Sequence, residues 1–359
     1  MLALLAGAAL LAQQQGELQV DKGYYLPNPG GGESRLLLMV KEERLDPPKI
    51  APLQNWMFEW LTTGFALGEA GFSLRLRVYS QQRRQENDVA PLVARMVMRL
   101  WDYNYLRLMR DHSQQYNNQI VDFYLCFGGE AGGEHLFDED LEGDRPRKVN
   151  TVYIYQIQSF RDPLEMAREV AHEYGHATLP PVGGFVKPED WGNGYLGEKL
   201  FLRYLRDEIK AGRLNEADAM GASLPALGKW VATHVDPLVL AAGTSGPVDR
   251  VLRAKGQKGL DAYLGLALYA ELLLPQRAFA RSLFLTGSTH PWDYPNGIVL
   301  AATEVEDLEL RVPPMLAGKP LWVPLAKGKL TGGTVLKRQG DWAQVRPAGS
   351  SLRIKNPPP

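Results

Sequence analysis

The spacing of apolar residues predicts both strands and helices in the first half of the chain. Short apolar runs and alternating apolar and polar residues predict strands at residues 35–41, 72–79, 120–127 and 150–158. Apolar residues recur every three or four positions over residues 87–109, which predicts a long amphipathic helix. A shorter helix is expected over residues 55–67. The polar, glycine-rich and acidic residues 128–148 are expected to form a loop.

The second half of the chain changes from helices to short strands. Helical spacing covers residues 196–211, 224–234 and 259–285, the last with a break near Pro275. Further on, short apolar stretches alternate with glycine and proline and predict strands at residues 305–312, 321–325, 334–338 and 342–346. A mixed first half, a helical middle and an all-β end together indicate an α+β protein.

These patterns divide the chain into five segments. In chain order we expect a signal-like segment (1–12), a linker (13–33), a mixed αβ domain (34–185), a helical domain (186–290), and a small β-module with a tail (298–359).

The first segment indicates export. Residues 1–12 are rich in leucine and alanine, like the apolar core of a secretory signal, and cleavage is expected after Ala12. The segment is too short to span a bilayer, and no later run reaches the roughly 18 apolar residues of a transmembrane helix. We therefore expect a secreted or periplasmic protein that is not an integral membrane protein.

Charge and cysteine content remove several classes of partner and site. The net charge of −1 gives no global basic surface, so we expect neither nucleic acid nor an anionic membrane as the main partner. Cys126 is the single cysteine of the chain. Disulfides within the chain and cysteine-rich zinc sites are therefore excluded.

The chemistry of the chain is concentrated at residues 172–176, His-Glu-Tyr-Gly-His. This is the H-E-x-x-H pattern of zinc hydrolases. On a helix, His172 and His176 project from one face and can bind one Zn²⁺ at about 2.0–2.1 Å each. Glu173 flanks the same face and is placed to accept a proton from metal-bound water.

The residues around this pattern favour a helix with defined ends. Asp162, Pro163 and Glu165 provide an N-cap, a proline at the first helical position and an acidic third position. Two prolines after Leu179 end the helix. A catalytic zinc takes three protein ligands and keeps one open position, so a third ligand is needed. Glu189, Asp190 and Glu198 follow the motif and are the candidates.

His172, Glu173, His176 and Glu198 together resemble the site of the gluzincin metallopeptidases. In that clan the third zinc ligand is a glutamate on the next helix, which implies that Glu198 completes the ligand set. The asparagine directly before this glutamate and the aspartate four residues after it are replaced here by Gly197 and Leu202. The resemblance is therefore to the clan and not to one of its families.

The resemblance also implies a fold and further residues of the site. The fold would be zincin-like, with a mixed αβ upper subdomain and a helical lower subdomain. The strand at residues 151–156 would form the edge of the cleft and pair with a peptide substrate. A tyrosine or histidine of the lower subdomain would stabilise the oxyanion, and four candidates remain open: Tyr195, His234, His290 and Tyr294.

The end of the chain has a weaker likeness. Residues 340–346, Gly-Asp-Trp-Ala-Gln-Val-Arg, are similar to the final strands of bacterial SH3-like modules. Such a module implies contact with the cell envelope. We therefore expect an exported, zinc-dependent peptidase that acts on peptides or proteins. The alternative is an inactive zincin-fold protein with a binding or envelope-structural role. Endo- or exopeptidase action, the substrate and the oligomeric state stay open.

Overall fold

The computed structural model describes residues 21–45, 58–81, 89–110, 120–140, 147–186 and 188–357. The signal-like segment 1–12 and residues 13–20 of the predicted linker lie outside this set. The chain divides into two compact units, whose ranges are 1–105, 110–179 and 201–228 for the first, and 106–109, 180–200 and 229–359 for the second. Helices and strands are mixed in the order predicted for an α+β protein.

A seven-stranded sheet forms the first unit, with the order β1-β2-β3-β4-β5-β7-β6. The strands are β1 (Gly23–Leu26), β2 (Leu36–Leu45), β3 (Phe58–Gly68), β4 (Gly71–Ser80), β5 (Val121–Leu125), β6 (Gly132–Asp140) and β7 (Arg147–Tyr155). Strands β1 to β4 are antiparallel, β4, β5 and β7 are parallel, and β6 is antiparallel to β7. Strand β1 lies within the segment that was predicted to be a linker.

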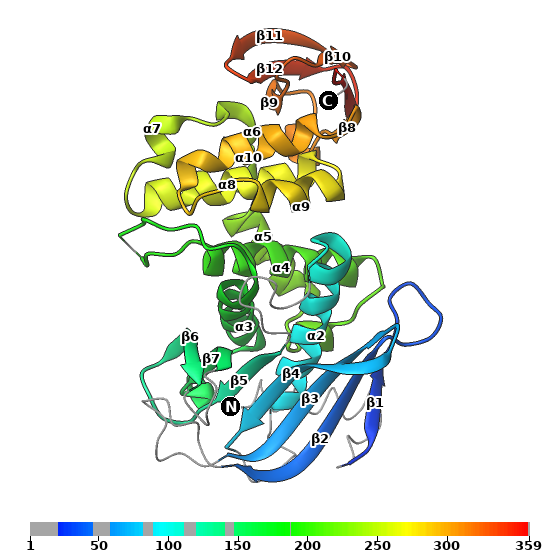
Figure 1. The fold of residues 1–359 in the computed structure, drawn as a ribbon, viewed down its shortest axis with the longest axis vertical. Helices are drawn as coiled ribbons and strands as arrows, with labels where there is room; N and C mark the ends of the chain where they lie inside the picture. Colours follow the sequence, from blue (N-terminus) through cyan, green and yellow to red (C-terminus); the bar gives the residue numbers. More distant parts are fainter. Residues whose placement is uncertain are drawn as a thin grey trace. The chain divides into compact units, whose positions relative to one another are not determined.

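Two helices cover one face of this sheet, α2 (Ala90–Arg107) and α3 (Pro163–Thr178) (Figure 1). Helix α2 packs closely, since a Cβ at Gly64 of β3 would lie 2.5 Å from the Met98 sulfur. A buried ion cluster ties α2 to the 3-10 helix η3 (Glu216–Ala219), where Asp218 accepts from Arg95 Nε at 2.9 Å and from Arg99 Nε at 2.8 Å. The predictions of α2, β2, β4, β5 and β7 are confirmed.

Two predictions for this unit are wrong. Residues 55–67 were expected to be helical, but β3 begins at Phe58 and pairs with both β2 and β4. Its residues alternate in burial, and periodicity cannot separate helix from strand in so short an apolar segment. Residues 128–148 were expected to be a loop, and residues 128–131 are irregular, but Gly132–Asp140 forms β6 along the whole length of β7; residues 141–146 lie outside the described residues.

Strand β6 also corrects the predicted edge of the cleft. The strand expected at the edge, residues 151–156, belongs to β7, which pairs with β5 on one side and β6 on the other. β7 is therefore interior, and β6 is the last strand of the sheet. Helix α3 packs against β6 and β7. In the described part of the chain, β6 is therefore the outermost strand next to the H-E-x-x-H helix.

The rest of the chain is helical up to Thr303. The helices are α4 (Asn193–Lys210), α5 (Leu224–His234), α6 (Asp236–Ser245), α7 (Asp249–Leu252), α8 (Gln257–Leu273), α9 (Gln276–Phe284) and α10 (Tyr294–Thr303). The predicted break near Pro275 is the boundary between α8 and α9. Among the described residues, no helix has the length and apolar character needed to span a bilayer.

Two small antiparallel sheets end the chain, with the orders β10-β13-β8 and β11-β12-β9. Their strands are β8 (Asp307–Arg311), β9 (Leu321–Pro324), β10 (Lys329–Thr331), β11 (Gly333–Gln339), β12 (Trp342–Pro347) and β13 (Ser351–Lys355). We call residues 307–357 the β-module. It belongs to the same compact unit as α6 to α10, and the buried Tyr269 hydroxyl donates to the Trp322 carbonyl at 2.6 Å. The predicted boundaries at 290 and 298 stay a prediction.

Candidate metal centre

Helix α3 has the ends that its sequence predicts. The Asp162 side chain accepts from Glu165 N at 2.9 Å, and Pro163 occupies the first helical position, where no backbone donor is needed. At the other end, Leu179 N donates to Gly175 O at 2.9 Å. The apolar side, which includes Met166, Val170 and Tyr174, is buried. The helix is therefore fixed by its own caps and by packing before any metal is considered.

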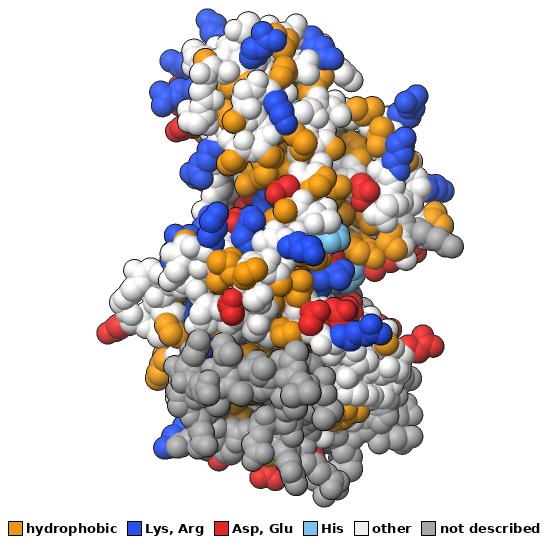
Figure 2. Space-filling view, turned by 180° about the vertical axis from the view of Figure 1, so that it is seen from behind, with side chains coloured by type: hydrophobic (Ala, Val, Ile, Leu, Met, Phe, Trp, Pro, Cys, Tyr) orange, Lys and Arg blue, Asp and Glu red, His pale blue; other side chains and the backbone are white. Residues whose placement is uncertain are grey.

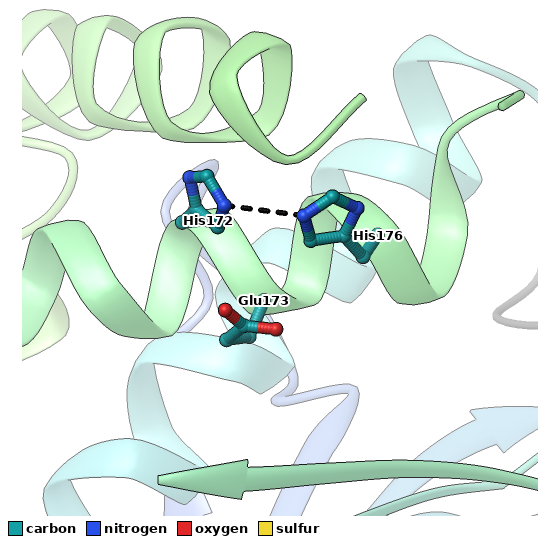
Figure 3. Close-up of side chains that lie close together, drawn as sticks. All are labelled: His172, Glu173 and His176. Carbon is teal, nitrogen blue, oxygen red and sulfur yellow. Dashed lines mark hydrogen bonds between the residues drawn. The ribbon is translucent and has the colours of Figure 1, made fainter. Parts of the chain in front are cut away.

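The two motif histidines lie next to each other on α3 (Figure 3). Their Nε2 atoms are 3.1 Å apart. Together with Glu173 they form a group whose ligand atoms all lie within 4.8 Å of one another. Two nitrogens at this separation can both bind one ion at the usual Zn–N distance of about 2.0–2.1 Å. The donor set therefore fits one metal ion.

Glu173 is buried, with 4% of its surface exposed. Strand β6 comes so close to it that a Cβ at Gly133 would lie 2.5 Å from Glu173 Cγ and 2.7 Å from Glu169 Oε1. Only a residue without a side chain leaves this space to the two carboxylates. Since a buried carboxylate loses most of its hydration, it needs compensation from nearby polar groups or a cation.

Strand β6 adds a histidine that the sequence analysis did not single out. His135 Nε2 and Asn150 Oδ1 are 2.6 Å apart, and Asn150 Nδ2 donates to Ala177 O of α3 at 3.0 Å. The His135 ring lies parallel to the His176 ring, with 6.4 Å between centroids. Burial lowers the pKa of His135 to about 4, so His135 is neutral at pH 7.

This histidine was missed because its segment was predicted to be a loop. The stretch Glu134-His135-Leu136 alternates polar and apolar residues, and that alternation is the signal that could have indicated a strand. Because Asn150 Nδ2 donates to the helix, its Oδ1 accepts, and His135 Nε2 carries the proton. The pair links β6 and β7 to the end of α3.

The candidates for a third ligand differ in burial. Glu198 lies in α4 and is 4% exposed, whereas Asp190 is exposed and Glu189 is partly exposed. Lys199 Nζ lies 3.4 Å from Glu198 Oε2 and 5.3 Å from the centre of the Tyr195 ring. All three acids belong to the second compact unit, so their part in a ligand set with His172 and His176 stays a prediction.

The four candidates for oxyanion stabilisation also lie in different environments. Tyr294 is 1% exposed, and its hydroxyl lies 3.3 Å from Ser282 Oγ in the core, where burial raises its pKa. His234 stacks on Trp230, and the exposed His290 stacks on Trp292. Tyr195 is partly exposed. Tyr294 is thereby disfavoured, because a fully enclosed hydroxyl cannot contact a substrate.

The group on α3 has the parts of a hydrolytic metal site. Two imidazoles could hold an ion, and the Glu173 carboxylate, whose ligand atom lies within 4.8 Å of theirs, could then accept a proton from a water bound to it. Comparison of the chain with protein-family models and with curated proteins found no match to either.

Proposed function

We propose that the protein is a zinc-dependent peptidase of the gluzincin type. The observation that carries this proposal is the geometry on α3, where two Nε2 atoms 3.1 Å apart and the buried Glu173 carboxylate form one compact group. A structural zinc site is usually closed by four protein ligands and has no use for such a carboxylate. The buried Glu198 is the third ligand in this proposal.

In this proposal the residues of the site have separate roles in metal binding and proton transfer. His172, His176 and Glu198 would hold Zn²⁺, and a bound zinc ion supplies a water of lowered pKa, near 7, and polarises the carbonyl of the substrate. Glu173 accepts the proton from the attacking water and then passes it to the leaving amine. The caps and packing of α3 keep both histidines and Glu173 in place.

Strand β6 supplies a binding edge for an extended peptide. Its neighbour β7 is paired on both sides, whereas β6 is the terminal strand of the described sheet and packs against α3. An extended substrate can therefore add to β6 through backbone hydrogen bonds, which do not depend on its sequence. In this proposal β6 takes the role first assigned to residues 151–156.

The remaining expectations belong to the same proposal. Residues 34–185 would be the upper zincin subdomain, residues 186–290 with α4 the lower one, and residues 298–359 an SH3-like module with a tail. The chain acts after export, in the periplasm or outside the cell. The alternative, an inactive zincin-fold protein of the envelope, predicts metal binding without hydrolysis.

The direct test measures zinc and hydrolysis on the same samples. The purified full-length chain should bind about one zinc per molecule and cleave a mixed peptide library. His172→Ala and His176→Ala should each remove both properties, and a chelator should do the same reversibly. Absence of zinc after refolding in its presence would refute the proposal. Zinc binding with no cleavage of any peptide would support the inactive alternative.

A second experiment identifies the third ligand. Glu198→Ala should lower zinc affinity strongly, and Asp190→Ala, at an exposed position, should change it little. Each variant is compared by competition with a zinc chelator, after circular dichroism has confirmed its fold. The opposite ranking would assign the ligand to Asp190, while leaving the peptidase proposal in place.

A further inference from the structure

The β-module carries a charge that differs from that of the rest of the chain. The β-module, residues 307–357, contains nine lysines and arginines against three acidic residues, a net charge of +6. Since the whole chain has a net charge of −1, residues 1–306 carry −7. All nine basic side chains are exposed, and the face of the module visible in Figure 2 shows several of them with little Asp or Glu. The near-neutral total therefore hides two regions of opposite sign.

Four of these cations lie on neighbouring segments of the module. Arg338 of β11 donates to Ala326 O at 2.9 Å, which places it beside the loop that contains Lys327. Lys329 follows on β10 and lies directly opposite Lys355 of β13 in the antiparallel ladder. We call Lys327, Lys329, Arg338 and Lys355 the basic edge. Among the described residues, none of the four forms an ion pair; the module's ion pair joins Arg353 and Asp307 at 3.6 Å.

Within the basic edge, Lys329 and Lys355 place two like charges directly opposite each other, while Asp307 of β8 lies opposite Lys355 on the other side of β13. Like charges directly opposite each other on neighbouring strands are destabilising. Two apolar side chains accompany these cations on β11, Val335 with 37% and Leu336 with 43% of its surface exposed. The ladder has a bulge between Val335 and Lys337, so Leu336 has no partner residue on β12. Both features become favourable on a surface that offers negative charge and an apolar layer.

We propose that the basic edge, with Val335 and Leu336, docks the protein on a bilayer that contains anionic phospholipid. Lysine and arginine near such a surface each contribute about 1 kcal/mol, or roughly a fivefold gain in partitioning. Leu336 and Val335 enter the headgroup layer, as the apolar residues of surface-bound segments do. The acidic remainder of the chain is repelled by the same surface, which orients the β-module toward it.

Exposed apolar residues favour lipid over nucleic acid as the occupant. Proteins that bind single-stranded nucleic acid stack bases on accessible aromatic rings. The tryptophans of the β-module, Trp322 and Trp342, are only 4% and 6% exposed, and Lys337 lies 5.1 Å from the centre of the Trp322 ring. A hydrophilic polyanion would also gain nothing from Leu336.

The test compares vesicle binding of matched variants of the full chain. Wild type should sediment with vesicles of equal parts phosphatidylcholine and phosphatidylglycerol, and not with phosphatidylcholine alone. Binding should weaken strongly at about 1 M salt, where the Debye length is about 3 Å. The variant K327Q/K329Q/K355Q should partition about a hundredfold less, because three cations are removed. Leu336→Ser should bind several-fold less than wild type at unchanged charge.

The control removes the same charge elsewhere in the second unit. Lys229, Lys255 and Lys258 are exposed and lie outside the β-module, so K229Q/K255Q/K258Q should bind within a few-fold of wild type. Equal loss in both triple variants would show attraction by total charge alone and would overturn the proposal. Equal binding of duplex DNA by wild type and Leu336→Ser, with no vesicle binding, would overturn it in favour of a nucleic-acid partner. Zinc content and peptidase activity should not differ among these variants in solution, which separates this proposal from the proposed function.

Discussion

The site on α3 and the β-module place their charged groups in opposite environments. Around α3, Glu173 is 4% exposed, and the nearby core of the same unit buries Arg95, Arg99 and Asp218. In the β-module all nine basic side chains are exposed. A buried charge loses its hydration and depends on a few fixed partners, whereas an exposed charge keeps its water and acts through the sum of many weak interactions. Single substitutions should therefore have large effects in the first region and small, salt-dependent effects in the second.

The largest effect is expected for Glu173→Gln. Glutamine keeps the size of the side chain but cannot accept a proton at neutral pH. Since general acid–base groups contribute about 10²- to 10⁴-fold, kcat should fall by at least that order while zinc content stays near one per chain. Peptide hydrolysis at equal zinc loading measures the change. Glu42→Gln, at an exposed position of β2, is the control and should retain activity. Equal rates for all three proteins would show that Glu173 is not the base.

The next largest effect is a loss of stability when the buried ion cluster of Asp218 is broken. Asp218→Asn leaves two buried guanidinium groups without their carboxylate, so the free energy of unfolding should fall by about 3–5 kcal/mol. Asp249→Asn removes an exposed ion pair with Arg253 and should change the free energy of unfolding by no more than about 0.5 kcal/mol. Urea unfolding of both variants measures the contrast. Equal losses would contradict the distinction between buried and exposed charges.

The ion cluster of Asp218 should also make the stability of the protein depend on pH. Burial alone would raise the pKa of Asp218, but Arg99 and Arg95 outweigh it and hold the pKa below its usual range. The contribution of this carboxylate to stability is therefore complete above its unfolded pKa, near 3.9, and is lost as the pH falls through the lower folded value. Between pH 5 and strongly acidic conditions, wild type should lose more stability than Asp218→Asn.

An intermediate effect is expected where β6 meets Glu173. Gly133→Ala would place a methyl group against Glu173 Cγ and Glu169 Oε1, and the carboxylate of Glu173 would have to move. Because a displacement of about 1 Å can cost 10²-fold in rate, we expect a loss of that order in kcat with zinc still bound. Gly228→Ala is the matched control, since nothing lies within 4 Å of its added Cβ. Full activity of Gly133→Ala would show that Glu173 adjusts freely.

The smallest effect is expected on the β-module, where a substitution should raise the stability of the protein and not lower it. Lys329→Glu turns the like-charge pair with Lys355 into an opposite-charge pair, which should raise the free energy of unfolding by about 0.2–1 kcal/mol. The gain should shrink as salt is added. The same variant should bind anionic vesicles less well than wild type. A loss of stability at low salt would show that Lys329 is stabilised by its surroundings and would weaken the contrast between the two regions.

Helix α3 and strand β6 show why prediction from the sequence succeeded for one half of the site and failed for the other. The signals of α3 are local, because Asp162, Pro163 and the apolar spacing act within a few residues of one another. Strand β6 is polar and glycine-rich, and it is a strand because β7 lies beside it. His135 and Gly133 were consequently not assigned to the site.

The β-module gives a similar lesson about charge. Its nine basic residues are evident in the sequence, but the total of −1 for the whole chain led to the expectation that an anionic membrane would not be a main partner. The register of β10 with β13 and the hydrogen bond from Arg338 bring four of them onto neighbouring segments, and Leu336 lies two residues before Arg338 on β11. A total charge has no spatial information, so only the strand pairing could reveal this surface.

The sequence by itself determined the α+β class, the limits of helix α3 and the pairing of His172 with His176, because these depend on short-range periodicity and capping. The tertiary structure alone decided that β6 is the edge next to that helix, that His135 and Asn150 join it to α3, and that Glu173 is enclosed by Gly133. The physical reason is the range of the interactions involved. Helical hydrogen bonds close within four residues, whereas strand pairing and burial depend on residues that are distant in the chain.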